Sequence, residues 1–308
     1  MIVLQRAWSA WLSFLDRPFP SWPLVWAKRG VCACLVIDLL AIVVFGAWSG
    51  VLYEAVHGGL IRQPKSWEML HHVFQDAAWI GPFWWSASLV LLGSVALGVG
   101  GRWPLILGIV AYAQLGHFDW PGDRGIDRIS RTVLLILAFS DVGRAKVPAT
   151  VSAWPAHLLR LLLVLIYVDA GIAKLDSKPS WFTLGAFNPL YGIMAAPQVG
   201  RLSADFFHPY MPVFTFFASG TVILEFTSPV LLFPKIGKYW AIFGAALHVG
   251  LAITMNLGIF PYAMLALYPL LLLPWFSGSA GSSSRSGSGT SAMASMRPRA
   301  PSAEGSRT

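Results

Sequence analysis

The stretch that decides the fold is Arg160-Leu-Leu-Leu-Val-Leu-Ile-Tyr-Val-Asp-Ala-Gly-Ile-Ala-Lys-Leu-Asp176. Its apolar run is long enough for a transmembrane helix, which needs about 20 predominantly apolar residues. The run nevertheless carries an arginine at its start, an aspartate inside it, and a lysine and an aspartate where it ends. A charged side chain in hydrocarbon costs at least about 2.5–3.5 kcal/mol. We therefore expect these charges to face protein or a wet cavity, or else to snorkel to the interface or form structural ion pairs.

The polar residues of this stretch fall on two faces of the expected helix. An ideal helix turns about 100° per residue, which places four side chains within roughly 40° of one line: Arg160, Tyr167, Gly171 and Lys174. Asp169 points to the opposite side. The sequence therefore predicts one functional face that ends at Lys174, and it predicts that Asp169 pairs with some other helix.

The composition of the whole chain indicates a membrane protein. Its 308 residues are 56% hydrophobic and only 12% charged, whereas a soluble domain is nearer 25% charged. Several long apolar runs accompany this bias and favour helical membrane spans. The net charge of +8 is read as a determinant of membrane topology and not as a nucleic-acid footprint, so we expect no nucleic-acid partner.

Neither the first residues nor the cysteines add a separate function. Residues 1–30 mix charges with aromatic residues and prolines, which is typical of an interfacial N-terminal segment and not of a cleavable signal peptide. Cys32 and Cys34 point in different directions on a helix, so we expect them to act as small apolar residues. His57, His71 and His72 have no metal-binding spacing, and we predict no metal site.

The apolar runs predict an all-α integral membrane fold with about eight transmembrane helices. The expected spans are residues 31–53, 80–98, 103–115, 132–140, 154–174, 212–233, 240–257 and 260–276. The fourth is too short, so it must begin inside the preceding polar turn and bury Asp127, Arg128 or Arg131, which we expect to pair internally. Residues 181–210 cannot span and predict a re-entrant or interfacial segment. Pro229 frees the carbonyl of Glu225 and predicts a kink.

Three parts of the chain follow from this pattern. Residues 1–30 form the interfacial N-terminal segment, residues 31–276 form one transmembrane domain, and residues 277–308 form a disordered tail of Ser, Gly, Pro and Arg. With eight spans, thirteen Lys and Arg lie on the side of the two termini and eight on the other side. The excess of basic residues predicts that both termini are cytoplasmic.

Three ionisable residues come from three different spans and are the candidate catalytic groups: Lys174, Glu225 and His248. Burial of a lysine disfavours its charged form, so Lys174 could act as a base or hold an anion. A nearby Glu225 or His248 could instead keep it charged, and the sequence leaves both possibilities open. No P-loop, dinucleotide fingerprint or nucleophile motif accompanies them.

Several motifs together resemble a known family. Ala170-Gly-Ile-Ala-Lys-Leu-Asp176 with Trp181 after it, His248, and Gly258-Ile-Phe-Pro-Tyr-Ala-Met-Leu-Ala266 are similar to the membrane domain of the vitamin K-dependent gamma-carboxylase. The same order of features marks its bacterial relatives, the HTTM (horizontally transferred transmembrane) proteins. Their polar turn resembles residues 122–131, and their late Glu-x-x-x-Pro resembles Glu225 to Pro229.

The resemblance implies a chemistry. In the carboxylase a lysine, matched by Lys174, helps to deprotonate a reduced quinone, which then reacts with oxygen. It implies a lipid quinone as the ligand, with cofactor-binding positions that we assign to Arg160, Tyr167 and Trp181. Two departures stand out: Ala173 replaces the second lysine of that family, and only a short tail follows Phe276 where the family has a large extramembrane part. Carboxylation of peptides by this chain alone is therefore not expected.

Two classes of function remain open. The first is a quinone-linked acid–base or redox enzyme of a bacterial inner membrane that uses Lys174. The second is a non-catalytic membrane module, either a partner subunit or a transporter-like binder of an amphipathic ligand, in which the same charges set helix packing. Expected partners are the lipid bilayer, a lipid-soluble small molecule and a soluble partner protein. No inverted repeat is visible, which weakens the transporter hypothesis.

Overall fold

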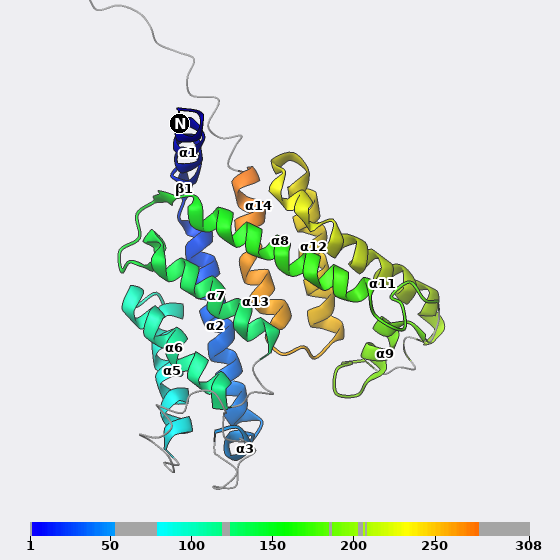
Figure 1. Cartoon of the computed structure of the whole chain (residues 1–308). Coiled ribbons are helices and arrows are strands. Elements are labelled where there is room, and N and C mark those ends of the chain that lie inside the picture. Colours follow the sequence, from blue (N-terminus) through cyan, green and yellow to red (C-terminus); the bar gives the residue numbers. More distant parts are fainter. Residues whose placement is uncertain are drawn as a thin grey trace, which may run out of the picture.

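The computed structural model is an all-helical bundle (Figure 1). It describes residues 2–52, 79–118, 124–184, 187–202, 206 and 208–276. The helices of the first half, in chain order, are α1 (Ile2–Leu15), α2 (Trp22–Val44), α3 (Trp48–Leu52), α5 (Ile80–Ala96), α6 (Arg102–Phe118), α7 (Gly125–Phe139) and a 3₁₀ turn (Asp141–Gly143).

The second half adds the elements around the opening stretch. They are α8 (Trp154–Leu175), α9 (Pro189–Ala195), a 3₁₀ turn (His208–Tyr210), α11 (Met211–Phe226), a 3₁₀ helix (Ser228–Leu232), α12 (Pro234–Thr254), α13 (Phe260–Leu267) and α14 (Pro269–Phe276). In Figure 1, α2, α5, α6 and α7 gather on one side, α8, α11 and α12 on the other, and α13 and α14 lie between them.

A short strand pair joins the start of the chain to the start of α8. β1 (Pro18–Pro20) runs antiparallel to β2 (Thr150–Ser152), with Phe19 opposite Val151. The side chain and the backbone N–H of Ser21 both donate to the carbonyl of Ala149, which extends the connection. This pairing anchors the N-terminal end of α8 to the start of the chain.

The first long helix begins earlier than predicted. α2 starts at Trp22 and not near residue 31, so Lys28 and Arg29 belong to the helix. Pro23 stands in its first turn, where a missing N–H breaks no helical hydrogen bond. Lys28 is buried, and its ammonium donates to the carbonyl of Val142 over 2.5 Å. That partner lies 114 residues away and was invisible to the sequence pattern, which read Lys28 as an interfacial charge.

Each of the eight predicted spans overlaps a helix, and three of them are interrupted. The span 31–53 is divided between α2, which ends at Val44, and α3. α11 ends at Phe226, and a 3₁₀ helix follows, because Pro229 cannot donate to the carbonyl of Glu225. The last predicted span is divided at Tyr268 into α13 and α14, since Pro269 lacks an N–H as well. The expectation that α7 begins inside the polar turn is confirmed, with Asp127 buried in its first turn.

Among the described residues, one helical stretch is long and apolar enough to cross a membrane. This stretch is Ile236–Thr254 in α12, and two shorter apolar stretches are Ile80–Ala96 and Phe260–Leu272. α2 and α8 are longer than α12, but each contains three charged residues. The number of spans therefore stays a prediction. α1 and the end of α14 lie at the same end of the bundle in Figure 1, as an even number of passes requires.

One large apolar core fills the bundle. It takes buried leucines from α2, α7 and α8 together with Met264 and Leu267 of α13. Many large apolar side chains point outward instead, for example Val44, Val90, Phe216 and Ile253. An outer surface this rich in apolar side chains suits contact with lipid. A smaller cluster of Met194, Phe214 and Met255 supports α9 beside α11.

Candidate functional site

The first site joins the end of α8 to α11. The ammonium of Lys174 donates to both carboxylate oxygens of Glu225, over 2.8 Å to Oε1 and 2.7 Å to Oε2. The side chains are 19% and 9% exposed, so the ion pair is largely shielded. The ammonium also lies 5.2 Å from the ring centre of Trp181, a cation–π distance. Three residues that the sequence assigned to the site are thus brought together.

A glycine lets the two helices approach closely beside this pair. A Cβ at Gly171 would lie 3.0 Å from the backbone nitrogen of Phe226 and 3.4 Å from the carbonyl carbon of Glu225. The missing side chain therefore brings the backbone of α11 against α8 one turn before Lys174. This close contact is what places Glu225 within reach of the lysine.

A second polar group lies further back on the same face of α8. Tyr167 is buried, and its hydroxyl forms hydrogen bonds with Nε2 of His248 over 2.7 Å and with the hydroxyl of Tyr268 over 2.9 Å. Gly244 leaves room for this arrangement, because a Cβ there would lie 2.3 Å from the Tyr268 hydroxyl oxygen. His248 therefore contacts Tyr167 and not the Lys174–Glu225 pair. The sequence analysis did not include Tyr268, which lies two residues after the motif Gly258–Ala266.

His248 is only 1% exposed, and its Nδ1 has no hydrogen-bond partner among the residues that the structure describes. The imidazole can be arranged in two ways. If Nε2 carries the hydrogen, it donates to Tyr167 and leaves a bare lone pair on Nδ1. If Nδ1 carries the hydrogen, Nε2 accepts from Tyr167 and a buried N–H is left unpaired. Either arrangement leaves Nδ1 unsatisfied, at a cost of about 1–3 kcal/mol. In the first arrangement the Tyr167 hydroxyl hydrogen points toward Tyr268, and in the second it points toward His248.

The structure places Arg160 elsewhere. Its guanidinium donates to the carbonyl of Leu270 over 3.0 Å, and it lies 6.0 Å from the ring centre of Phe19. Arg160 and Lys174 are fourteen residues apart, or about 21 Å along an ideal helix. Arg160 thus joins α8 to α14 and the N-terminal strand. Asp169 is exposed, and the described residues offer it no ion pair, so the expected pairing with another helix is not found there.

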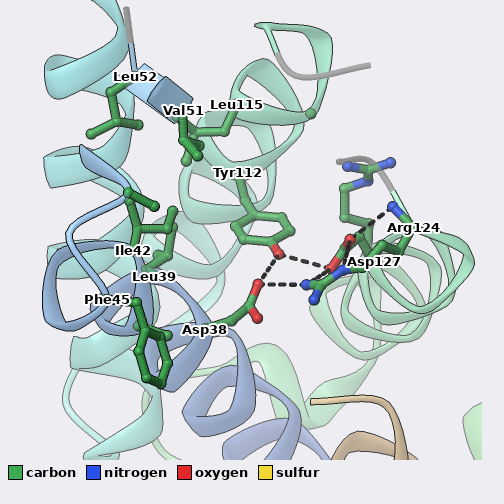
Figure 2. Close-up of a pocket in the computed structure, with 14 residues that line it drawn as sticks. Asp38, Leu39, Ile42, Phe45, Val51, Leu52, Tyr112, Leu115, Arg124 and Asp127 are labelled. Carbon is green, nitrogen blue, oxygen red and sulfur yellow. Dashed lines mark hydrogen bonds and ion pairs between the residues drawn. The ribbon is translucent and has the colours of Figure 1, made fainter. Parts of the chain in front are cut away.

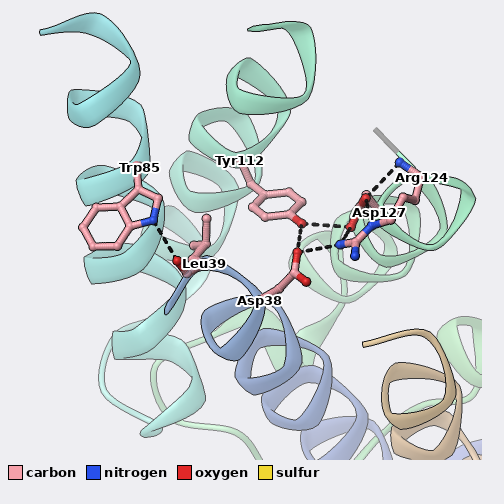
Figure 3. A network of polar contacts seen from close by, with 6 residues as sticks. All are labelled: Asp38, Leu39, Trp85, Tyr112, Arg124 and Asp127. Atoms are coloured by element: carbon pink, nitrogen blue, oxygen red, sulfur yellow. Dashed lines mark hydrogen bonds and ion pairs between the residues drawn. The ribbon is translucent and has the colours of Figure 1, made fainter. Parts of the chain in front are cut away.

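A separate charged network, which sequence reasoning did not assemble, joins α2, α6 and α7 (Figure 3). Arg124 donates to Asp38 over 2.5 Å and to Asp127 over 3.0 Å. The hydroxyl of Tyr112 lies 2.9 Å from Asp127 Oδ1 and 3.5 Å from Asp38 Oδ2. Internal pairing was predicted for the turn, and Arg124–Asp127 confirms it. A lone Asp38 in an apolar span was the available signal, because such a charge requires a partner.

A cavity of about 340 Å³ lies against this network (Figure 2). The charged network forms one side, and the other walls are mainly apolar. The lining residues are Asp38, Leu39, Ala41, Ile42, Phe45, Ala47, Val51, Leu52, Tyr112, Leu115, Gly116, Arg124, Asp127 and Arg131. Lys174, Glu225 and His248 are not among them, so this cavity and the Lys174 pair are two distinct regions.

The described residues offer no group of three or more His, Cys, Asp and Glu that could hold a metal ion. The three histidines weighed for a metal in the sequence lie outside the described residues. Cys32 and Cys34 are buried free thiols. The first site supplies a carboxylate and an ammonium group, and the polar group around Tyr167 supplies phenol and imidazole groups.

The fold and these buried polar groups define a helical membrane protein with ionisable residues inside its bundle. The family model described as HTTM domain matches residues 140–275, which contain α8 and the whole Lys174 region. This match confirms, over residues 140–275, the resemblance to HTTM proteins that the motifs predicted, and it supports the assignment as a membrane protein. The match covers the second part of the predicted domain 31–276. No curated protein and no solved structure matches the chain.

Proposed function

We propose that the protein is a membrane enzyme that removes a proton from a lipid-soluble ligand with a weakly acidic hydroxyl, such as a quinol, at Lys174 and Glu225. The observation that supports this most is the bidentate ion pair, with both Glu225 oxygens within 2.8 Å of the lysine. A shielded charge in a membrane helix is costly and is more often functional than incidental.

The ion pair divides the work between its two members. A protonated lysine cannot accept a proton, so the base is Glu225, whose carboxylate takes the hydroxyl proton of the ligand. The ammonium of Lys174 stays in place and balances the negative charge left on the ligand oxygen. The net charge of the site is unchanged by this transfer, because one ammonium–carboxylate pair is replaced by one ammonium–oxyanion pair. That balance favours the reaction in a medium of low dielectric constant.

The surrounding aromatic residues give the proposed ligand something to pack against. Trp181 lies beside the ammonium and offers an aromatic face at the end of α8. Tyr167 sits on the same face of α8 and belongs to the buried network with His248 and Tyr268. We assign Trp181 to ligand contact and the Tyr167 network to a proton-carrying relay behind it. Arg160 has no role in this assignment, because it lies at the far end of α8.

The wider setting follows the same proposal. The protein lies in a bacterial inner membrane with about eight spans and both termini in the cytoplasm, and a soluble partner protein supplies the substrate-handling part. A quinol, when bound, supplies electrons to an oxidant such as molecular oxygen.

The alternative function is a non-catalytic membrane module that binds an amphipathic partner. It is favoured by the close contact at Gly171, where the ion pair could serve to fix α11 against α8. Under that alternative, Lys174 and Glu225 are a packing device.

The test uses the full chain, purified in detergent and supplied with decylubiquinol. We expect quinol-dependent oxygen uptake that falls at least tenfold in Glu225→Gln and in Lys174→Ala. The matched control is Asp169→Asn, which neutralises an exposed carboxylate on the opposite face of α8 and should leave uptake unchanged. Uptake that persists in Glu225→Gln, or that is absent from the wild-type protein, would overturn the enzyme proposal and favour the alternative.

A further inference from the structure

The cavity beside Asp38 has no role in the function proposed above. We propose that it is a second binding site, independent of Lys174, for a neutral lipid-like molecule that ends in a hydroxyl group. The hydroxyl would donate to Asp38, and the apolar part would lie along α2, α3 and α6.

The size and walls of the cavity fit such a ligand. Its volume of about 340 Å³ lies within the range of about 300–1,000 Å³ that is usual for small-molecule sites. Figure 2 shows Ile42, Val51, Leu52 and Leu115 on one side and the polar side chains on the other. A cavity that is mostly apolar with a few convergent polar groups is the usual form of a ligand site.

The polar end leaves one acceptor available. Asp127 is fully used, since its two oxygens accept from Arg124 and from the Tyr112 hydroxyl. Oδ2 of Asp38 accepts from Arg124, and the Tyr112 hydroxyl is 3.5 Å away. Oδ1 of Asp38 receives no hydrogen bond from the described residues, and the side chain is 22% exposed. This oxygen at the cavity wall can accept one hydrogen bond from a ligand.

The charges that line the cavity favour a neutral ligand. Two carboxylates, Asp38 and Asp127, face two guanidinium groups, Arg124 and Arg131, so the formal charges of the lining cancel. An ammonium or phosphate head would bring a net charge into a largely apolar space, at the cost that burial of an uncompensated charge carries. A hydroxyl satisfies the free oxygen of Asp38 without adding any charge. A lipid alcohol is therefore the chemistry that matches the site.

The test is photolabelling of the full chain in lipid nanodiscs with a diazirine-bearing octanol. We expect saturable labelling of the peptides that contain residues 38–52 and 112–116, with competition by excess octanol. A diazirine-bearing octane without the hydroxyl should label these peptides at least fivefold less, because it cannot donate to Asp38.

A cavity-filling variant separates binding from folding. Ala47→Trp places an indole in the cavity wall and leaves the charged network intact, so we expect at least a fivefold loss of labelling. The matched control, Val44→Trp, changes a highly exposed residue outside the cavity lining and should label as the wild type does. Asp38→Asn keeps an acceptor oxygen and should retain more labelling than Asp38→Ala. Size-exclusion profiles show whether each variant is folded.

Three outcomes would overturn this site. One is equal labelling by the octane probe, which would mean that the hydroxyl is not recognised. Another is stronger labelling by a diazirine-bearing octylamine, which would make the ligand a cation. The last is unchanged or non-saturable labelling in Ala47→Trp. None of these results depends on oxygen uptake at Lys174, so the two proposals fail separately.

Discussion

The two charged regions of the bundle pair their buried charges in different ways. At the end of α8, one lysine faces one glutamate, and every carboxylate oxygen is used. Between α2, α6 and α7, Arg124 pairs with both Asp38 and Asp127, and the Tyr112 hydroxyl adds a hydrogen bond to Asp127. One oxygen of Asp38, beside the cavity, has no partner among the described residues. The first region is a closed pair and the second is an open network. Both regions contain paired charges, but only the second lies against a cavity, so an ion pair by itself does not locate a ligand site.

The largest effect is expected in the closed pair. Glu225→Ala leaves the Lys174 ammonium in a shielded site, and such a loss typically costs about 3–5 kcal/mol of stability, of which we expect the lower end because Lys174 is 19% exposed. The double variant Lys174→Ala/Glu225→Ala removes both charges and should be more stable than Glu225→Ala. Unfolding of the purified variants in mixed micelles measures both. A double variant that is less stable than either single one would contradict the description of a closed pair.

A smaller loss is expected in the open network. Arg124→Ala leaves Asp38 and Asp127 without their shared cation, but the Arg124 side chain is 40% exposed, so water offsets part of the cost. We expect a destabilisation of about 2 kcal/mol, below that of Glu225→Ala. The same unfolding measurement compares the two. A larger loss for Arg124→Ala than for Glu225→Ala would reverse the ranking of the two regions.

The smallest effect concerns the tyrosine network behind Lys174. Tyr268→Phe removes one hydroxyl and its hydrogen bond to Tyr167, which is worth about 1 kcal/mol. If the network relays protons, quinol-dependent oxygen uptake should fall several-fold, although the protein remains folded. The phenylalanine ring keeps the packing against His248, so this substitution tests the hydroxyl without removing the ring contact. Unchanged uptake would restrict the chemistry to Lys174 and Glu225.

Much of the fold follows from apolar runs in the sequence. The runs at residues 80–98 and 154–174 coincide closely with α5 and α8, because such segments satisfy their backbone groups best as helices. α2 begins at Trp22, before the predicted span starts at residue 31, and it includes Lys28 and Arg29, which the sequence had suggested for the interface. Burial of Lys28 depends on the carbonyl of Val142, a partner that no local pattern can show. The break after Phe226 agrees with the kink predicted from Pro229, whereas the break at Tyr268 was not predicted, although Pro269 follows it.

The candidate site was predicted in part. Lys174, Glu225 and Trp181 do meet, whereas His248 contacts Tyr167, and Arg160 lies at the opposite end of α8. The helical wheel placed Arg160 and Lys174 on one face, but it carries no information on distance along the axis. The network around Arg124 joins residues 86 positions apart in the chain, so periodicity could not find it.

By itself, the sequence determined that this chain is a helical membrane protein with charges inside its apolar segments, and its motifs indicated the HTTM domain that matches residues 140–275. Both follow from composition and from local order along the chain. Tertiary structure decided which charges meet, because the partner of a buried charge is set by the packing of helices that are distant in sequence. The close approach at Gly171 assigned Glu225 to Lys174. The packing of α2, α6 and α7 left an open oxygen of Asp38 against a cavity.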